Sequence, residues 1–193
     1  MRSWPIWTSP RRSPPNERDL HRSATRILSA QAMTAPAETR SGGCLCGAVR
    51  FSARLREASV GACHCETCRR WTGSALLSVA VPRGDLTWSG EDRIATRQTS
   101  AWASRSWCRD CGSTLFFQVT APGPESERTW LALGLFDDPD GLQLASEIYI
   151  DQKPDGFAYA GTGRQLMTRQ QCIDAYVPVN ATQPDRGDSH DQD

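Results

Sequence analysis

The stretch "GGCLCGAVRF" (residues 42–51) joins a C-x-C pair, Cys44 and Cys46, to a segment in which apolar and polar residues alternate. Alternation with a period of two predicts a β-strand, here over residues 47–55. Gly47 directly follows Cys46, and a glycine at this place permits the positive φ that turns backbone N–H groups toward cysteine sulfurs. The stretch therefore predicts a metal-binding turn that leads into a strand.

Seven of the eight cysteines fall into three tight clusters. The clusters are Cys44 with Cys46, Cys63 with Cys65 and Cys68, and Cys108 with Cys111, while Cys172 stands alone. A disulfide within C-x-C is disfavoured because bonded Cβ atoms lie about 3.8 Å apart with a dihedral near 90°. Buried unpaired thiols would not explain the close spacing. Zinc takes four thiolates at about 2.3 Å and is the metal we expect; an iron–sulfur centre is the alternative.

Seven cysteines complete one four-ligand site and leave three over. Three protein ligands with an open position distinguish catalytic zinc from structural zinc. The middle cluster, in "CHCETCRRWTGSA" (63–75), could supply all three ligands of the open site, and the outer pairs would then close the structural one. Alternatively, the first four cysteines form the closed site. We favour the first partition because a compact triad needs no long-range assembly.

The rest of the chain predicts a mainly β protein. Further strands are expected at residues 74–82, 84–90, 113–119, 129–136 and 146–152, with turns at 121–126 and 137–141 and a helix indicated only at 164–177. We expect a zinc-binding domain over residues 41–161. An Arg-, Ser- and Pro-rich disordered extension (1–40), within which Met33 is an alternative start, would precede it. A C-terminal segment ending in a disordered tail (162–193) would follow.

Charge and hydropathy narrow the range of partners. The chain carries 22 basic and 22 acidic residues, so its formal net charge is zero and gives no long-range attraction to nucleic acid. No run approaches the roughly 18 apolar residues of a spanning helix, and the N-terminal region has no apolar secretory segment. We expect a soluble, cytoplasmic protein with no membrane contact; its oligomeric state stays open.

Three stretches together resemble a known family. These are "GGCLCGAVRF" (42–51), "CHCETCRRWTGSA" (63–75) and "SRSWCRDCGSTLF" (104–116), with "LFDDPDG" (135–141) and "EIYIDQKPDGFAYAG" (147–161) in support. They resemble the glutathione-dependent formaldehyde-activating enzyme family, whose domain is shared with centromere protein V. Phe157 stands where many members carry tryptophan.

The resemblance implies a β-tent fold of small antiparallel sheets around a structural zinc. It also implies two zinc ions per chain. The structural ion would be held by Cys44, Cys46, Cys108 and Cys111, and the functional ion by Cys63, Cys65 and Cys68. The family's named activity joins glutathione to formaldehyde to give S-hydroxymethylglutathione, a carbon–sulfur lyase reaction run backwards.

Other residues near the clusters have expected roles. Arginine forks bind carboxylates well, so we expect Arg69, Arg70 and Arg105 to bind glutathione; surface charge that offsets an anionic zinc centre is the alternative. Alternation points His64 away from its flanking cysteines, which favours a packing or supporting role over a fourth zinc ligand or a proton shuttle. Cys172 is interpreted as an ordinary thiol. The three nearby tryptophans, Trp71, Trp102 and Trp107, are interpreted as packing residues.

Three functions compete. The first is a zinc-dependent carbon–sulfur lyase that acts on a thiol such as glutathione and a small electrophile such as formaldehyde. The second is a non-catalytic zinc-binding module that acts through a protein or nucleic-acid partner, and the third is a thiol-based enzyme for another electrophile. A purely structural module would gain stability by closing its metal site, so an open triad favours an enzyme.

Overall fold

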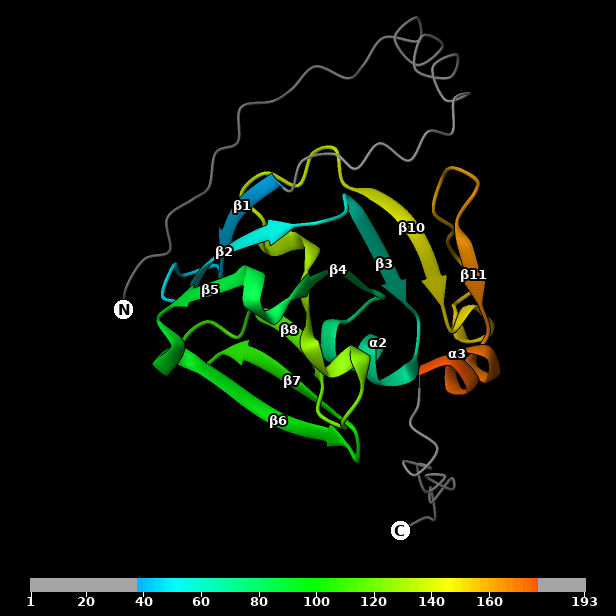
Figure 1. Ribbon diagram of the computed structural model, residues 1–193. Coiled ribbons are helices and arrows are strands. Elements are labelled where there is room, and N and C mark those ends of the chain that lie inside the picture. Colours follow the sequence, from blue (N-terminus) through cyan, green and yellow to red (C-terminus); the bar gives the residue numbers. More distant parts are fainter. Residues whose placement is uncertain (1–37, 177–193) are drawn as a thin grey trace, which may run out of the picture. The chain divides into compact units, whose positions relative to one another are not determined.

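A computed structural model describes residues 38–176, which form two β-sheets and two short helices. The smaller sheet contains three antiparallel strands in the order β1 (Glu38–Gly43), β2 (Arg50–Leu55) and β5 (Leu86–Ser89). In Figure 1 these strands lie together, and the turn between β1 and β2 is the one that carries the C-x-C pair.

The larger sheet contains eight strands in the order β11-β10-β3-β4-β9-β8-β7-β6. Their bounds are β3 (Ser59–Cys63), β4 (Leu76–Pro82), β6 (Ile94–Ser100), β7 (Ala103–Cys108), β8 (Thr114–Val119), β9 (Arg128–Ala132), β10 (Gln143–Ile148) and β11 (Gln165–Met167). The helices are α2 (Glu66–Thr72) and α3 (Arg169–Tyr176), and short 3₁₀ turns occur at η1 (Arg83–Asp85), η2 (Glu91–Arg93), η3 (Pro124–Glu127), η4 (Leu133–Leu135) and η5 (Ile150–Gln152).

The prediction of a mainly β protein is confirmed, but one of the two sheets also contains parallel strand pairs, which were not expected. The smaller sheet is antiparallel, whereas the larger sheet is mixed, because β10 pairs in parallel with both β3 and β11. Strand direction depends on how the chain returns to the sheet, and hydrophobic alternation carries no signal for it. The return here follows the turn at 137–141, which leads β10 onto the free edge of β3.

Several predicted strand ends shift where a turn replaces the strand. The strand expected at 47–55 begins only at Arg50, because residues 44–49 form the cysteine turn. The strand expected at 129–136 ends at Ala132 and gives way to η4, and β10 ends at Ile148 before η5. In the segment 164–177, three residues form β11 and the helix begins only at Arg169.

Five strands and one helix were not predicted from the sequence: β1, β3, β6, β7, the three-residue β11, and α2. Strands β1 and β6 are mostly polar, and β3 and β7 are interrupted by glycine, serine or arginine. The helix α2 has only seven residues, too few for a helical period to emerge. These elements form because they pair with or pack on neighbours, and local propensity contributes little.

The hydrophobic core lies between the smaller sheet and the centre of the larger one. Phe51 of β2 packs edge-on against Phe136 with ring centroids 5.2 Å apart, and against Trp88 at 5.6 Å. Val79 and Leu131 face this core from β4 and β9 and are fully buried. Cys44 and Cys108 belong to the same buried cluster, so the outer cysteine site is part of the core.

The predicted N-terminal extension, apart from its last three residues, and the tail beyond Tyr176 lie outside the described residues. The division of the chain into extension, domain and tail therefore stays a prediction, although β1 begins at Glu38 and β11 and α3 follow residue 161. Within residues 38–176 no helix is long and apolar enough to cross a membrane.

Gly42 provides a direct test of the packing between β1, the Phe51 side chain of β2 and the 3₁₀ turn η4. A Cβ at this position would lie 2.3 Å from the carbonyl oxygen of Leu135 and 2.4 Å from Cζ of Phe51. We expect Gly42→Ala to lower the free energy of unfolding by about 2 kcal/mol or more, because backbone and ring must move apart. Gly134→Ala is the matched control, since nothing lies within 4 Å of its added Cβ. Equal denaturant midpoints for the two variants would contradict this packing.

Candidate functional site

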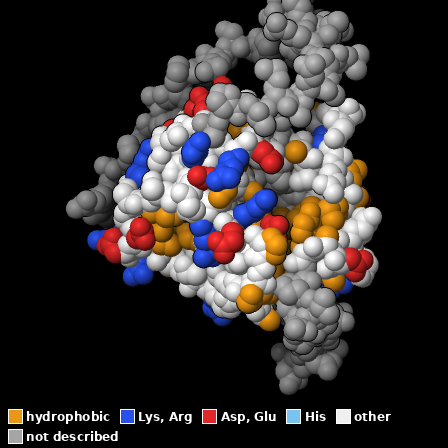
Figure 2. Space-filling view, in the orientation of Figure 1, with side chains coloured by type: hydrophobic (Ala, Val, Ile, Leu, Met, Phe, Trp, Pro, Cys, Tyr) orange, Lys and Arg blue, Asp and Glu red, His pale blue; other side chains and the backbone are white. Residues whose placement is uncertain are grey.

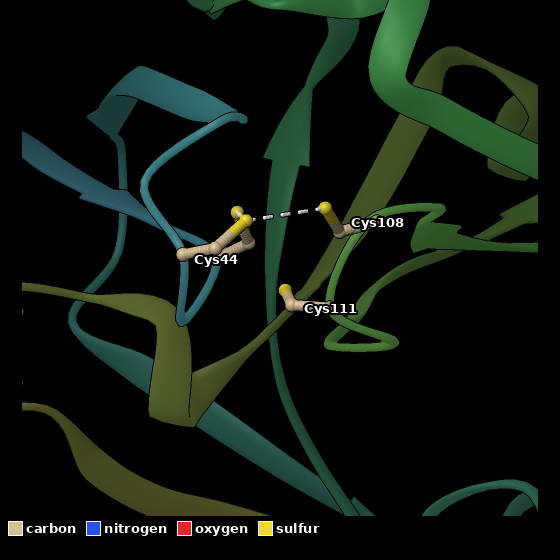
Figure 3. A group of neighbouring side chains, drawn as sticks. Cys44, Cys108 and Cys111 are labelled. Carbon is tan, nitrogen blue, oxygen red and sulfur yellow. Dashed lines mark hydrogen bonds between the residues drawn. The ribbon is translucent and has the colours of Figure 1, made fainter. Parts of the chain in front are cut away.

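Four cysteine sulfurs from two distant loops meet at one point. Cys44 and Cys46 come from the β1–β2 turn, and Cys108 and Cys111 come from the end of β7 and the loop before β8. All four Sγ atoms lie within 4.8 Å of one another. Cys46 Sγ lies 3.5 Å from Cys44 Sγ and 3.8 Å from Cys108 Sγ. Figure 3 shows the sulfurs of the labelled Cys44, Cys108 and Cys111 directed toward one another.

The spacing of these sulfurs suits a tetrahedral metal ion. Four sulfurs at about 2.3 Å from a zinc ion lie about 3.8 Å from one another. Gly47 has φ 77°, the positive value that its place after Cys46 predicts, and Gly112, which follows Cys111, has φ 75°. The backbone N–H of Val49 donates to Cys44 Sγ at 3.3 Å. The N–H of Leu45 donates to the Ser113 hydroxyl at 3.1 Å and thereby ties the two loops together.

Among the four cysteines of the first group, Cys111 has a thiol that is readily ionised. Burial raises the pKa of the Cys111 thiol, but the hydroxyl and the backbone of Ser113 hydrogen-bond to it and lower the pKa to about 6. The Cys111 Sγ lies 3.2 Å from the Ser113 Oγ. A group of four sulfurs that holds negative charge at neutral pH is a ligand set that a divalent cation stabilises.

The remaining three clustered cysteines form a second, smaller group. Cys63 ends β3, Cys65 caps the N-terminus of α2, and Cys68 lies within that helix. Their Sγ atoms lie within 4.8 Å of one another. The backbone N–H of Cys68 donates to Cys65 Sγ at 3.4 Å. The sulfurs thus gather as four and three, which favours the first of the two partitions that the sequence left open.

The triad shares its protons unequally. Hydrogen bonds from Cys63 and Cys68 lower the pKa of Cys65 to about 3, and the same contact with Cys65 raises the pKa of Cys63. Among the three hydrogen-bonded sulfurs, Cys65 is the one whose thiolate form is most favoured. A cation would release the protons from the other two sulfurs, since thiolates are the form that binds metal.

His64 points away from the triad, as strand alternation predicts. Its side chain is fully buried, and Nε2 lies 3.0 Å from Oε2 of Glu147. The Nδ1 atom is buried and has no hydrogen-bond partner within residues 38–176. No His, Asp or Glu of the described chain joins the three sulfurs as a fourth potential ligand. The geometry therefore agrees with a packing role for His64.

Glu147 and Arg164 were missed by the sequence reasoning. Glu147 is only 4% exposed and lies between His64 and Arg164, whose Nε donates to its Oε1 at 2.7 Å. Arg164 also donates to the carbonyl oxygens of Tyr159, Ala160 and Gly161. This buried network fixes the loop after η5 beside the His64 ring, which Phe157 and Tyr159 approach to 6.1 Å between ring centroids. No local motif links residues 64, 147 and 164, so the sequence carried no signal for it.

The three expected arginines do not converge on one site. Arg69 Nε donates to the carbonyl of His64 at 3.0 Å, and the exposed Arg70 pairs with Glu66 at 2.7 Å. Both line a cavity of about 410 Å³ that also contacts Phe157. Arg105 is 5% exposed and instead lines a second cavity of about 260 Å³, which it shares with Arg70.

Arg105 contacts the triad itself. One of its terminal nitrogens donates to Cys68 Sγ at 3.4 Å, and the other donates to the hydroxyl of Thr99. The guanidinium carbon lies 5.6 Å from the ring of Trp71 and 5.2 Å from that of Phe117. A positive charge held by two rings stabilises a neighbouring thiolate, so Arg105 favours the ionised form of the cluster.

Two further residues near the triad have unusual environments. Tyr149 has φ 57° and is the only non-glycine residue with positive φ within the described range. Burial raises the pKa of its phenol, and the charges of Cys65, Cys172 and Cys63 contribute to the same shift. Cys172 is 1% exposed and belongs to neither sulfur group, which agrees with its interpretation as an ordinary thiol.

Comparison with known proteins places these features in a family. The family model described as "Glutathione-dependent formaldehyde-activating enzyme" matches residues 39–152, a range that contains both sulfur groups. A Schizosaccharomyces pombe (strain 972 / ATCC 24843) protein, "Uncharacterized lyase C29B12.13", is 31% identical over 120 residues, which cover 62% of this chain and 84% of that protein. A Rhodobacter sphaeroides protein of known crystal structure aligns with a TM-score of 0.44 and 21% identity, over 66% of this chain and 99% of that chain. The chain belongs to the glutathione-dependent formaldehyde-activating enzyme family.

Proposed function

We propose that the protein is a zinc-dependent carbon–sulfur lyase that reversibly joins a thiol such as glutathione to formaldehyde or a similar small electrophile. The observation that carries this proposal is the sulfur triad, which offers three ligands and is joined by no His, Asp or Glu as a fourth ligand within the described chain. Arg105, which contacts Cys68, lines the cavity of about 260 Å³, and Arg69 and Arg70, which follow Cys68 in the chain, line the cavity of about 410 Å³. The family and the name of the yeast relative support lyase chemistry.

Each sulfur group fits a zinc ion by its donor chemistry. The outer four cysteines would hold a structural ion, and Cys63, Cys65 and Cys68 would hold the second ion. A zinc ion bound at the triad supplies a positive centre that keeps an incoming thiol deprotonated. The protein positions the three sulfurs through the end of β3 and the first turn of α2, which are joined by His64 and the N-cap Cys65.

The protein's own residues would bind and orient the thiol. The cavity of about 410 Å³ is lined by Arg69, Arg70 and Glu66. Glu66 pairs with Arg70, so Arg69 is the cation that suits a carboxylate of glutathione. Phe157 covers part of the same cavity, and the cation of Lys153 lies 4.9 Å from its ring. In the reaction, the thiol sulfur forms a bond to the aldehyde carbon, the carbonyl π bond breaks, and the oxygen takes up the proton that the thiol released.

The competing function is a non-catalytic zinc-binding module with a protein or nucleic-acid partner. Figure 2 shows basic and acidic side chains interspersed on the face in view, and the net charge of the chain is zero. Nucleic-acid binding depends on neutralising phosphates with clustered positive charge, so this distribution favours a small-molecule substrate.

The first test is metal stoichiometry with and without glutathione. We expect two zinc ions per chain, measured by native mass spectrometry, because each sulfur group provides one site. Glutathione should form a ternary complex in wild type and fail to do so after Cys65→Ser. A single ion that glutathione does not affect would favour the binding-module function.

The second test separates the roles of the two sulfur groups. Structural zinc contributes about 10–16 kcal/mol in small peptides, and whole domains are stable by only about 5–15 kcal/mol. We therefore expect Cys111→Ser to unfold the protein and Cys65→Ser to leave it folded with one zinc ion fewer. Cys172→Ser is the control and should keep both ions. Loss of near-UV circular dichroism in Cys65→Ser as complete as in Cys111→Ser would contradict the division of roles.

The third test is the reaction itself. Adduct formation from glutathione and ¹³C-formaldehyde can be followed by exchange NMR, which separates the catalysed rate from the spontaneous one. We expect wild type to accelerate the exchange and Cys65→Ser to lose at least about 99% of that acceleration, because nucleophile activation depends on the triad. Exchange at the spontaneous rate in the presence of zinc-loaded wild type would count against formaldehyde as substrate.

A further inference from the structure

The smaller cavity, of about 260 Å³, has a composition that selects a particular class of ligand. It lies where α2 covers the outer strands β6 and β7, and three arginines line it, Arg70, Arg97 and Arg105. Trp71 and Trp107 form apolar walls, and no aspartate or glutamate lines this cavity. A small pocket with positive charge and flat aromatic walls suits a small planar anion.

Two of these arginines lie directly opposite each other in the sheet. Arg97 of β6 and Arg105 of β7 are partners in the antiparallel ladder. Side chains at such positions share a face with Cβ atoms about 4.5–5.5 Å apart, and like charges there destabilise the pair. The side chain of Arg97 is exposed, and its guanidinium makes no hydrogen bond or ion pair with any residue that the structure describes. An anion between the two guanidinium groups would remove this repulsion.

Arg105 connects the cavity to the sulfur triad. Its side chain is buried, with only 5% of the residue exposed. Its Nε has no partner within the described chain, and one terminal nitrogen donates to Cys68 Sγ. The charge of Arg70 is offset by Glu66, so the guanidinium of Arg97 and the unpartnered Nε of Arg105 remain to contact an anion. An anion held by this pair therefore lies one side chain away from the triad.

We propose that this cavity binds the carboxylate of the electrophile, so that the substrate class is small aldehydes that carry a carboxylate next to the carbonyl group, with glyoxylate as the simplest. This inference rests on the proposed lyase function and narrows its substrate. The cavity is too small for a tripeptide, whereas the larger cavity on the other side of Arg70 leaves room for the thiol.

The reaction with such an aldehyde is an addition, in which no group leaves either reactant. The thiol sulfur bonds to the aldehyde carbon, the carbonyl π electrons move to the oxygen, and the oxygen takes up the proton that the thiol lost. The carboxylate takes no part in bond making and stays in contact with Arg97 and Arg105. No oxidant or reductant is needed. The product is the hemithioacetal formed by the thiol and the aldehyde group, and it keeps the carboxylate.

The test compares glyoxylate with formaldehyde in zinc-loaded full-length protein. We expect a higher kcat/KM for glyoxylate after the spontaneous rate is subtracted. Arg97→Gln should raise the KM for glyoxylate about fivefold to tenfold and leave formaldehyde kinetics unchanged, because one charged hydrogen bond to the carboxylate is lost. Arg54→Gln is the matched control, an exposed arginine on β2 outside the cavity, and should change neither reaction.

A second thiol distinguishes the carboxylate of the electrophile from those of glutathione. With 2-mercaptoethanol, which has no carboxylate, the effect of Arg97→Gln on glyoxylate should persist. If the effect disappears with this thiol, or if Arg97→Gln also raises the KM of glutathione with formaldehyde, the cavity binds the thiol and the inference is wrong.

Measuring glyoxylate binding in the absence of thiol tests the carboxylate site independently of the proposed lyase activity. Titration calorimetry of glyoxylate without thiol should show binding to wild type and Arg54→Gln, weakened about fivefold to tenfold in Arg97→Gln and sensitive to salt. If this pattern appears but neither aldehyde is turned over, the carboxylate site stands and the lyase proposal fails. If wild type does not bind glyoxylate, the inference fails even where formaldehyde is turned over.

Discussion

The convergence of four sulfurs from the β1–β2 turn and the β7–β8 loop is the constraint on which the structure depends. Cys46 and Cys108 are 62 positions apart in the chain, yet their sulfurs lie 3.8 Å from each other. Four thiolates at this spacing repel one another unless a cation lies between them. Since Cys108 and Arg105 belong to the same strand, a cation that fixes the end of β7 also fixes the arginine that contacts the second sulfur group.

The triad is held by shorter-range interactions. Its three cysteines come from six consecutive residues, and the strand-to-helix junction sets their directions. His64 turns to the other side, where Glu147 and Arg164 hold it and the following loop in place. The two groups therefore differ in origin: one assembles across the fold and the other forms within one junction. This difference explains why loss of one ion should unfold the protein and loss of the other should not.

The cysteine groups and their glycines were predictable because short metal-binding turns leave a local pattern of residues. Strands such as β4 and β8 were predictable because their apolar runs are bounded by turn residues. Strand β7 was not, because Ser104, Arg105 and Ser106 are polar and yet buried, and their partners lie on other elements. For the same reason the sequence could not separate Arg105, which contacts Cys68, from Arg69 and Arg70, which line the larger cavity.

The central claim is that the triad is one ligand short and that an external thiol completes it. Zinc X-ray absorption spectroscopy of the zinc-loaded protein tests this most directly, because it distinguishes sulfur from oxygen or nitrogen neighbours. The account predicts a mixed first shell without thiol, and an all-sulfur shell after glutathione is added. An all-sulfur shell before addition, or a spectrum that glutathione leaves unchanged, would contradict it.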